Sequence, residues 1–314
     1  MTAESDRMAM GLAHQVQLEL DPLTRVAEGA TGLDLFRSAV AGSTIRLVSH
    51  EPIARVGEDP EGVHQARVAV RRLRSDLRLF RPLVDRRWAD ALRIELRWLG
   101  DLLAPVRDAE VLDARLRERI DGMATLELAP AKVLLDALEV DRMAARRRLL
   151  EGLDSRRYQE LVVRLVRAAL EPVRRGGSVD QPAARLGSLM DRPWEKLFTS
   201  AAALGSASSD AALHATRIHA KRVRYGAEAL APAFGKRAAR FADAAEALQE
   251  VLGEHQDAVV AMAFLADRGI AADDPAVAFS AGRLAEQESS SRDRARKRWP
   301  KAWKRLDRSM RFWR

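Results

Sequence analysis

Two stretches of this sequence share one helical pattern although 150 residues separate them. The first is VHQARVAVRRLRSDLRLF, residues 63–80, and the second is LHATRIHAKRVRYGAEAL, residues 213–230. In both, apolar residues recur every three or four positions, as they do on one face of an α-helix. Alternating Val, Ile or Thr runs bounded by Asn-Gly or Asp-Gly, which would indicate strands, do not occur in the sequence. We therefore expect an all-α fold.

The two stretches also keep their charged residues in register. At a constant offset of 150, the matched pairs are His64 and His214, Arg67 and Arg217, Arg71 and Lys221, Arg72 and Arg222, and Arg74 and Arg224. Further along, LLAPVRDAEVL (102–112) matches VLGEHQDAVVA (251–261) at an offset of 149, which pairs Asp108 with Asp257. A register kept over this distance predicts an internal duplication, with two copies of one helical unit packed as a pseudo-symmetric pair.

Gly and Pro divide the remaining helical pattern into segments. We expect helices over 32–56, 61–82, 87–103, 108–121, 129–152, 155–171, 183–205, 210–231, 236–252, 256–267 and 274–309. The breaks fall at EDPEG, FRPLVDR, LAPVRD, APAFG and ADDPA. The Gly, Ser, Asp and Pro residues of RRGGSVDQP (174–182) predict a linker at about 174–181, between a first half, 31–173, and a second half, 182–310. Residues 1–30 are expected to form a loosely attached N-terminal extension.

One face of the helix expected from residue 61 carries a line of positive charge. At about 100° per residue this stripe is about 80° wide, and it comprises His64, Arg67, Arg71, Arg74 and Arg78. The opposite side of the same helix is apolar and carries Val70, Leu73, Leu77 and Phe80. In the second stretch the stripe is repeated by His214, Arg217, Lys221 and Arg224. Each helix therefore has one face for packing and another that concentrates charge.

Such a stripe is unfavourable by itself, because like charges three or four residues apart on a helix repel by roughly a few tenths of a kcal/mol per pair. Asp76 lies about 120° from His64 around the helix, away from the stripe, and so does not offset the repulsion. A bound anion would, and the guanidinium group of Arg offers paired donors that match phosphate oxygens. A solvated or intramolecularly paired charged face is the alternative interpretation.

The 314-residue chain carries a formal net charge of +8, a balance that attracts polyanions. Eleven Lys or Arg and two Asp or Glu lie between Arg292 and Arg314, so the rest of the chain is nearly neutral, at −1. Trp299, Trp303, Phe312 and Trp313 are interleaved with these charges. They predict either a final helix packed through its aromatic residues, or a further contact with a polyanion or an anionic surface.

The sequence contains no cysteine, which excludes disulfides and thiolate metal sites and suits a reducing cytoplasm. No apolar run reaches the roughly 18–20 residues of a membrane helix. The N-terminus lacks the basic-then-apolar order of a secretion signal. We expect a cytoplasmic protein without a membrane span.

These residues resemble the CHAD domain, the "conserved histidine α-helical domain". Its pattern is a His, an Arg three residues later and a basic cluster close to Arg-Arg-Leu-Arg, once in each half, followed by Leu-Gly-x-x-(Arg/Asn)-Asp. Here the two copies are His64, Arg67, Arg71, Arg72, Leu73, Arg74 and His214, Arg217, Lys221, Arg222, Val223, Arg224, Tyr225. Ala104 replaces the usual Gly in the first trailing segment, and Gln256 precedes the Asp of the second. The resemblance covers about residues 31–310.

The resemblance implies two packed antiparallel four-helix bundles, a basic cleft or pore between them, and binding of inorganic polyphosphate. Together with the stripe geometry it gives these candidate polyphosphate-binding residues: His64, Arg67, Arg71, Arg72, Arg74, Arg78, His214, Arg217, Lys221, Arg222 and Arg224. Association with polyphosphate granules is the finer hypothesis. Many family members also carry a triphosphate-tunnel (CYTH) domain with a Glu-x-Glu-x-Lys motif. That motif does not occur here, so the hydrolytic or cyclase chemistry of that domain is not expected.

Two alternatives stay open: a nucleic-acid-binding helical module and a metal-dependent phosphohydrolase. The first would use base-stacking aromatic residues, and only Tyr225 adjoins the stripes. The second would use metal ligands and a catalytic constellation. His214 and His219 are about 140° apart on a helix, unlike a metal-binding pair, and EHQD (254–257) supplies no third good ligand. We expect no catalytic residue, metal or cofactor, and hence no enzyme activity.

Four other charged positions adjoin these motifs. Asp108 and Asp257 follow expected helix breaks, so N-capping is the plain interpretation, and orientation of the stripe arginines is the alternative. Arg97 and Arg107 are candidates for extending the basic surface, although neither has a basic counterpart in the second half.

Overall fold

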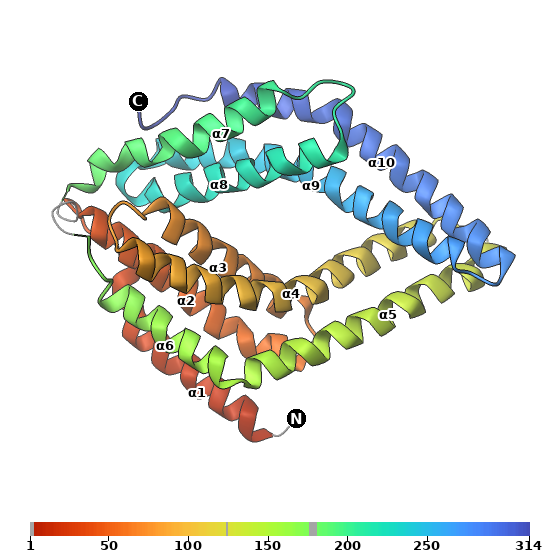
Figure 1. The fold of residues 1–314 in the computed structure, drawn as a ribbon, viewed down its shortest axis with the longest axis horizontal. Coiled ribbons are helices and arrows are strands. Elements are labelled where there is room, and N and C mark those ends of the chain that lie inside the picture. Colours follow the sequence, from red (N-terminus) through yellow and green to blue (C-terminus); the bar gives the residue numbers. More distant parts are fainter. Residues whose placement is uncertain (1–2, 124, 176–180) are drawn as a thin grey trace.

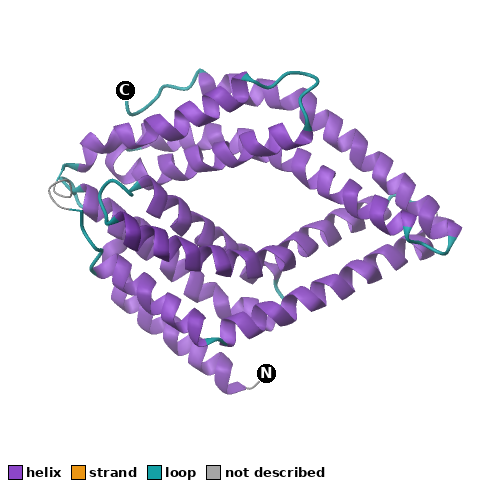
Figure 2. Cartoon of the chain, in the orientation of Figure 1, coloured by secondary structure: helices purple, strands orange, loops and turns teal. Residues whose placement is uncertain are grey.

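The computed structural model describes residues 3–123, 125–175 and 181–314, and within these ranges the protein consists of helices without strands (Figures 1 and 2). The helices are α1 (Ala3–Leu20), η1 (Asp21–Thr24), α2 (Gly32–Val56), α3 (Pro60–Leu79), α4 (Arg86–Ile120), α5 (Thr125–Asp154), α6 (Arg156–Leu170), η2 (Ala183–Met190), α7 (Asp191–Ala202), α8 (Asp210–Phe234), α9 (Lys236–Ile270) and α10 (Pro275–Asp307). The predicted all-α fold is confirmed. No helix in these ranges is long and apolar enough to cross a membrane.

Two groups of helices face each other across the molecule. In Figure 1 the first group, α2 to α6, lies below and the second group, α7 to α10, lies above. Within the groups, α2 packs on α3 and α6, α4 packs on α5, and α9 packs on both α8 and α10. The groups meet where α2 and α3 contact α8, and again where α4 and α5 contact α9 and α10. Helices α3 and α8, which carry the two stripes, are therefore neighbours.

The lengths of the helices in the two groups are comparable. Helices α4 and α9, which contain the segments matched at an offset of 149, each have 35 residues. In the first group the last helix is divided, because Ser155 ends α5 and caps α6 by accepting a hydrogen bond from the amide of Tyr158. The internal duplication itself stays a prediction from the sequence.

Two helices are longer than the sequence predicted. The breaks expected at 104–107 and 253–255 are wrong, because α4 continues through Pro105 and α9 is unbroken. Proline lacks an amide donor and favours a helix end. Leu103 and Val106, on either side of Pro105, are nevertheless both 1% exposed and continue the packed face. Tertiary packing therefore overrides the local preference.

The N-terminal region is more firmly attached than the sequence suggested. Helix α1 packs on α2, and its residues Val16 and Leu20 are buried. The expectation of a loose extension is wrong, because burying these side chains stabilises the contact. The amide of Ala183 also donates a hydrogen bond to the carbonyl of Ala30 at 2.9 Å, which ties the start of the second half to this region. The linker predicted at 174–181 lies mostly outside the described residues, which omit 176–180.

Local caps fix where the stripe helices begin. The side chain of Asp59 accepts a hydrogen bond from the amide of Glu61 at the start of α3, and Ser209 accepts one from Ala212 at the start of α8. His64 and His214 each lie five residues after their cap. The caps therefore give both stripes the same starting position along their helices.

Two hydrophobic cores join the groups. The larger core contains residues of both groups, among them Phe36, Leu73, Leu213 and Leu230. The smaller core lies where α4, α5, α9 and α10 converge, at the right of Figure 1, and includes Leu112, Leu116, Leu138, Leu265 and Leu284. The two groups are thus held together on both sides of the space between them.

Ion pairs reinforce the second of these junctions. Glu288 of α10 is completely buried and pairs with Arg115 and Arg119 of α4 at 2.5 and 3.0 Å. Glu254 of α9 pairs with the same Arg115 at 2.8 Å. Removing one partner from so buried a network leaves an uncompensated charge, which is strongly destabilising. This junction therefore fixes α4 against α9 and α10.

The aromatic residues near the C-terminus belong to the protein interior. Trp303 stacks on Trp194 of α7 with ring centroids 5.8 Å apart, and Trp313 packs edge-on against Phe241 of α9 at 5.0 Å. Trp299 is 8% exposed. Of the two interpretations of this segment, a final helix packed through its aromatic residues is confirmed.

Candidate anion-binding cleft

Between the two groups lies a cleft of roughly 1070 Å³, part of which is open to solvent. The stripe helices α3 and α8 and the long helices α4 and α9 form its walls. Its lining comprises His64, Arg67 and Arg71 of α3; His214, Arg217 and Lys221 of α8; Arg107, Asp108, Val111, Leu112 and Arg115 of α4; and Gln249, Gln256, Asp257 and Val260 of α9. The cleft therefore brings together six of the eleven candidate polyphosphate-binding residues, three from each half.

The positive charges of several cleft side chains repel one another, and this repulsion adds to burial in lowering their pKa values. Burial lowers the pKa of Arg71 and of Arg217, and repulsion from Arg67 lowers both further. Burial also lowers the pKa of Lys221 to about 7, together with repulsion from Arg217, Arg71 and Arg67. A nearby anion would favour the charged form of each of these groups. The cleft is thus prepared electrostatically for a ligand with negative charge.

Two acidic side chains face the cleft arginines. One nitrogen of Arg67, Nη1, donates to Asp108 Oδ1 at 2.5 Å and to the carbonyl of Ala104 at 3.0 Å. Burial raises the pKa of Asp257, and the attraction of Arg217 partly opposes this. Both aspartates lie inside the long helices α4 and α9, so the N-capping interpretation is wrong. The contact between Asp108 and Arg67 supports the alternative, which is orientation of the stripe arginines.

Each stripe histidine is influenced by a residue of a long helix. His214 Nδ1 lies 2.6 Å from Gln256 Oε1 and donates to it, because an amide oxygen can only accept. Burial lowers the pKa of His64, and the charge of Arg107 lowers it further. Arg107 and Gln256 occupy matching positions, each directly before a cleft aspartate. The two histidines therefore have different neighbours: an amide side chain beside His214 and a positive charge near His64.

The long helices contribute residues that the sequence identified only in part. Of the two arginines considered, Arg107 lines the cleft, whereas Arg97 is 72% exposed and lies 3.8 Å from Asp101. Arg115 also lines the cleft and was not predicted. The signal for it is its position eight residues, about two helical turns, after Arg107. The break expected at 104–107 placed Arg107 outside the expected helix that contains Arg115. In the second half the position that matches Arg115 is Phe264, so no repeated charge indicated Arg115 either.

Three candidate polyphosphate-binding residues, Arg74, Arg78 and Arg222, do not line the cleft. Although the side chain of Arg78 is exposed, loss of water around it lowers its pKa to about 10, with repulsion from Arg222 and Arg93 adding to this. Burial likewise lowers the pKa of Arg222, as does repulsion from Arg93 and Arg74. Burial also lowers the pKa of Arg74, and the attraction of Asp101 partly opposes this lowering. These arginines form a second cluster of like charge beside α4.

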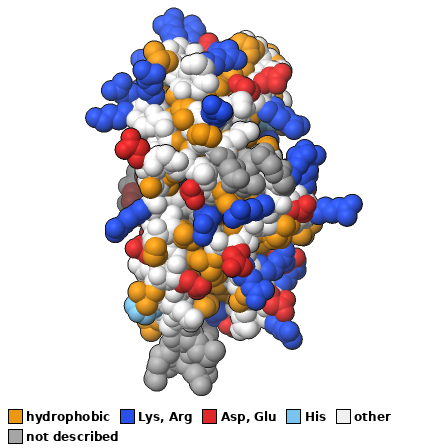
Figure 3. Space-filling model, turned by 90° about the vertical axis from the view of Figure 1, so that its left-hand side faces the viewer, with side chains coloured by type: hydrophobic (Ala, Val, Ile, Leu, Met, Phe, Trp, Pro, Cys, Tyr) orange, Lys and Arg blue, Asp and Glu red, His pale blue; other side chains and the backbone are white. Residues whose placement is uncertain are grey.

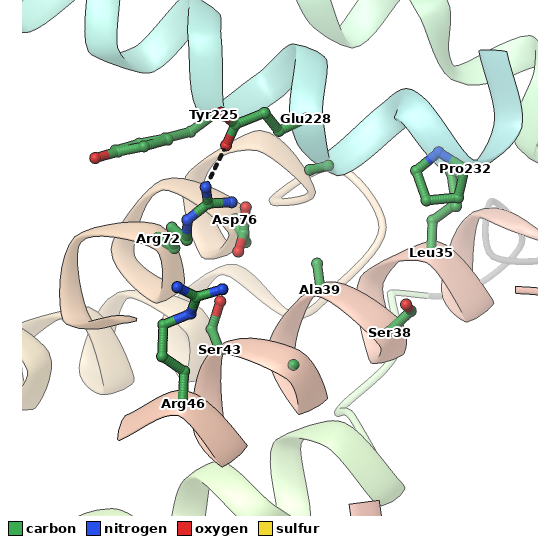
Figure 4. Close-up of a pocket in the computed structure, with 12 residues that line it drawn as sticks. Leu35, Ser38, Ala39, Ser43, Arg46, Arg72, Asp76, Tyr225, Glu228 and Pro232 are labelled. Atoms are coloured by element: carbon green, nitrogen blue, oxygen red, sulfur yellow. Dashed lines mark ion pairs between the residues drawn. The ribbon is translucent and has the colours of Figure 1, made fainter. Parts of the chain in front are cut away.

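Arg72 and Arg224 are neutralised within the protein. Arg72 Nη2 lies 2.7 Å from Glu228, and Arg224 lies 2.7 Å from both Glu228 and Glu246. Figure 4 shows Arg72 pointing to Glu228 across a separate pocket of about 640 Å³ between α2, α3 and α8. For these two residues, the structure agrees with the alternative interpretation, in which the charges are paired within the protein.

The same pocket contains a buried acid, Asp76, which is 4% exposed (Figure 4). Burial raises its pKa to about 7; Arg72 opposes the shift and Glu228 adds to it. Between about pH 4 and 7 the folded protein therefore keeps a proton on Asp76 that the unfolded chain has released. Stability contributed by this group falls as the pH rises through that window and stays low above it.

Substitution Asp76→Asn is expected to raise the melting temperature at pH 8, because the amide occupies the same space and needs no proton. The gain is at most roughly 4 kcal/mol, since the shift spans roughly three pKa units of about 1.4 kcal/mol each. It should shrink as the pH falls toward 4. Thermal melts from pH 4 to 8 test this, with Asp243→Asn, an exposed acid of α9, as control. Parallel pH profiles for both variants would contradict the assignment.

The histidines do not share a metal-like arrangement. His214 lines the cleft, whereas His219 lies 3.4 Å from Arg222 Nη1 and has a pKa lowered by burial and by that arginine. In the part of the chain that the structure describes, no group of three or more His, Asp or Glu side chains is placed to hold a metal ion.

The chain is similar to a protein family and to several known proteins. The CHAD domain matches residues 38–266. A curated relative, the uncharacterized protein Rv2226 of Mycobacterium tuberculosis, is 32% identical over 262 residues, which are 80% of this chain and 49% of that protein. The chain thus spans about half the length of the curated relatives that it matches.

Two solved structures are similar to most of the helical arrangement. PptA from Streptomyces chartreusis has a TM-score of 0.72 at 22% identity and covers 88% of this chain and 100% of its own, a likeness of fold alone. The CHAD domain from the plant Ricinus communis has a TM-score of 0.67 at 28% identity and covers 89% of this chain and 94% of its own. With the match over 38–266 and both stripe motifs in place, the chain belongs to the CHAD domain family.

Proposed function

We propose that the chain binds inorganic polyphosphate in the cleft between its two groups of helices. The observation that carries the proposal is the convergence of six stripe residues, three from each half, on one cleft. Burial and mutual repulsion lower the pKa of Arg71, Arg217 and Lys221 there. A chain of phosphates would supply the negative charge that these groups need. Membership of the CHAD family supports this choice of ligand.

The side chains of the cleft suit phosphate in geometry as well as in charge. A guanidinium group has five N–H donors and can hold two phosphate oxygens at once. Arg67 uses Nη1 for Asp108 and Ala104, which positions the group and leaves its other donors for a ligand. His214 uses Nδ1 for its hydrogen bond to Gln256, so its second ring nitrogen, Nε2, is not occupied by that bond.

The cleft is less suited to nucleic acid. Proteins that bind single strands usually stack bases on aromatic side chains, and no Phe, Tyr or Trp is among the residues that line this cleft. Tyr225 is 6% exposed, and the guanidinium group of Arg72 lies over its ring, 5.3 Å from the ring centroid. It is therefore not available to a base. A polymer of phosphates has no bases and requires no such platform.

We also infer that binding is not followed by hydrolysis. Of the two acids of the cleft, Asp108 is engaged by Arg67, and burial raises the pKa of Asp257, which disfavours the carboxylate form that a general base needs. Binding without turnover would let the protein associate stably with polyphosphate granules, which is the cellular role that we propose.

Competition for a labelled polyphosphate at near-physiological salt tests this function. Unlabelled polyphosphate should displace the label at lower concentration than single-stranded nucleic acid or heparin does, and no steady release of phosphate should occur. If all three polyanions compete equally well, the cleft attracts negative charge in general and does not select polyphosphate, which contradicts the proposal. Steady phosphate release that disappears in Arg71→Ala would contradict the inference of binding without turnover.

A further inference from the structure

The second half of α10 carries a basic surface that is separate from the cleft. Its exposed cations, here called the α10 basic face, are Arg294, Lys297, Arg298, Lys301, Lys304, Arg305 and Arg308. At about 100° and 1.5 Å per residue they occupy a strip about 120° wide and about 21 Å long. None of them lines the cleft. They also lie beyond residues 38–266, the part that matches the CHAD domain.

Packing on the other side of the helix holds this face outward. Ala295, Trp299 and Leu306 are buried, and Trp303 stacks on Trp194. In Figure 1, α10 runs along the outer margin of the second group, whereas α3 and α8 lie inside. The α10 basic face is therefore a fixed surface of the folded protein and faces away from the stripe helices.

The charge of this face is not balanced within the protein. Some exposed arginines elsewhere have an acidic partner one helical turn away, as Arg117 has Asp113 and Arg156 has Glu160. Figure 3 shows such mixing of Lys and Arg with Asp and Glu over one side of the molecule. By contrast, among the described residues no acidic side chain lies within ion-pair distance of any cation of the α10 basic face. The acids of the segment, Asp293 and Asp307, lie to one side and approach Arg292 and Arg311.

The composition of the face restricts the partner that it suits. Binding of single-stranded nucleic acid would use exposed aromatic rings, and binding to a membrane interface would use an apolar face turned to the lipid. The tryptophans and the apolar residues of this part of α10 are turned inward instead. A strip of cations without either feature suits a flexible phosphate polymer that is held by charge alone.

We propose that the α10 basic face is a second polyphosphate-binding surface, which rests on the function proposed for the cleft. A short chain that fills the cleft would not reach it. A long chain could occupy both surfaces of one protein molecule, or connect the cleft of one molecule with the α10 basic face of another. Linked binding of this kind raises affinity by about 10²- to 10⁴-fold without a new contact. The protein would thereby prefer long chains and cross-link them.

The test compares a short polyphosphate, about as long as the cleft stripe, with a long one. The variant is Lys297→Gln, Lys301→Gln and Arg305→Gln, on the exposed centre line of the face. Its affinity for the short chain should stay within about twofold of the parent, whereas its affinity for the long chain should fall at least about tenfold. Light scattering of mixtures with the long chain should fall as well. A matched control, Arg147→Gln, Arg148→Gln and Arg167→Gln, removes the same charge from exposed positions of α5 and α6.

The outcomes separate the two proposals. Unchanged long-chain affinity and scattering in the α10 variant, or equal losses in the matched control, overturn the second surface and leave the cleft untouched. Failure of the parent to bind the short chain overturns the cleft, while a long-chain difference between the two variants still supports the α10 basic face. If the α10 variant instead loses binding to duplex DNA or to anionic vesicles while its polyphosphate binding is unchanged, the face belongs to that partner. This result overturns the proposal.

Discussion

Replacing Arg71 and Arg217 together by alanine is expected to weaken polyphosphate binding by about 10²- to 10⁴-fold. The two side chains come from opposite halves of the chain and line the same cleft. A bound chain would therefore lose a charged contact on each side. Hydrogen bonds to charged groups contribute about 1.5–3 kcal/mol each, and about 1.4 kcal/mol corresponds to a factor of ten in affinity. Titration with polyphosphate at fixed salt measures the loss.

The same substitutions should change how binding depends on salt. Each phosphate that a protein cation contacts releases condensed counterions, so log affinity falls with log salt in proportion to the number of contacts. With the coefficient known for nucleic acids, about 0.9 per phosphate on duplex DNA, two lost contacts should make the slope less steep by about two. Titrations at several salt concentrations give this slope independently of the affinity at any one of them.

The fold should survive, because the substitutions remove charges that repel each other. The opposite face of α3 keeps Leu73 and Leu77, both fully buried. Arg147→Ala with Arg148→Ala on α5 is a suitable control, since both residues are exposed. Arg146 is not, because it donates to the carbonyl of Ala54 at the end of α2 at 3.0 Å. Unchanged affinity in the folded cleft variant, or an equal loss in the control, would reject the cleft as the binding site.

The cleft could be predicted from the sequence because helices α3 and α8 have a fixed geometry. A spacing of three and four residues places His64, Arg67 and Arg71 on one side of a helix whatever surrounds it. The apolar residues opposite them, such as Leu73, decide which side packs inward. The offset of 150 then carried the same expectation to α8. Residue types and spacing are sufficient for this part of the site.

The partners of the charges could not be predicted in this way. Arg72 pairs with Glu228, which lies in the other half, so the contact depends on how α3 packs on α8. Arg224 is neutralised by Glu246 of the next helix, which no spacing within α8 reveals. Likewise, Asp108 reaches Arg67 only because α4 continues through Pro105. Wherever tertiary packing decides, helical periodicity predicts the surface but not which charges stay free.

Polyphosphate affinity is expected to fall about tenfold for each pH unit above 7, and Lys221→Arg is expected to remove most of this dependence. In the free protein, burial lowers the pKa of Lys221 to about 7, with repulsion from Arg217 and Arg71 adding to the effect. A bound polyanion favours the charged ammonium group and raises this pKa. Above pH 7 binding must therefore take up a proton, at about 1.4 kcal/mol per pH unit. Arginine stays charged throughout and avoids this cost.

The cleft also contains a histidine and an aspartate whose pKa is shifted. Burial and the charge of Arg107 lower the pKa of His64. Asp257, which faces Lys221 and Arg217, has a pKa raised by burial from the usual carboxyl range. Its protonation would strengthen binding as the pH falls. The difference in slope between the parent and Lys221→Arg therefore separates the contribution of Lys221 from that of these two groups.

Two measurements check this at constant ionic strength. Affinity from pH 6 to 9 gives the slope, and calorimetry in buffers of different ionisation enthalpy counts the protons, with uptake of about one expected near pH 8. The control is Lys132→Arg, an exposed lysine of α5, which should leave both quantities as they are in the parent. If the parent and Lys221→Arg show the same slope and the same proton uptake, Lys221 is already charged in the free cleft. The repulsion among Arg71, Arg217 and Lys221 would then be too weak to prepare the site for its ligand.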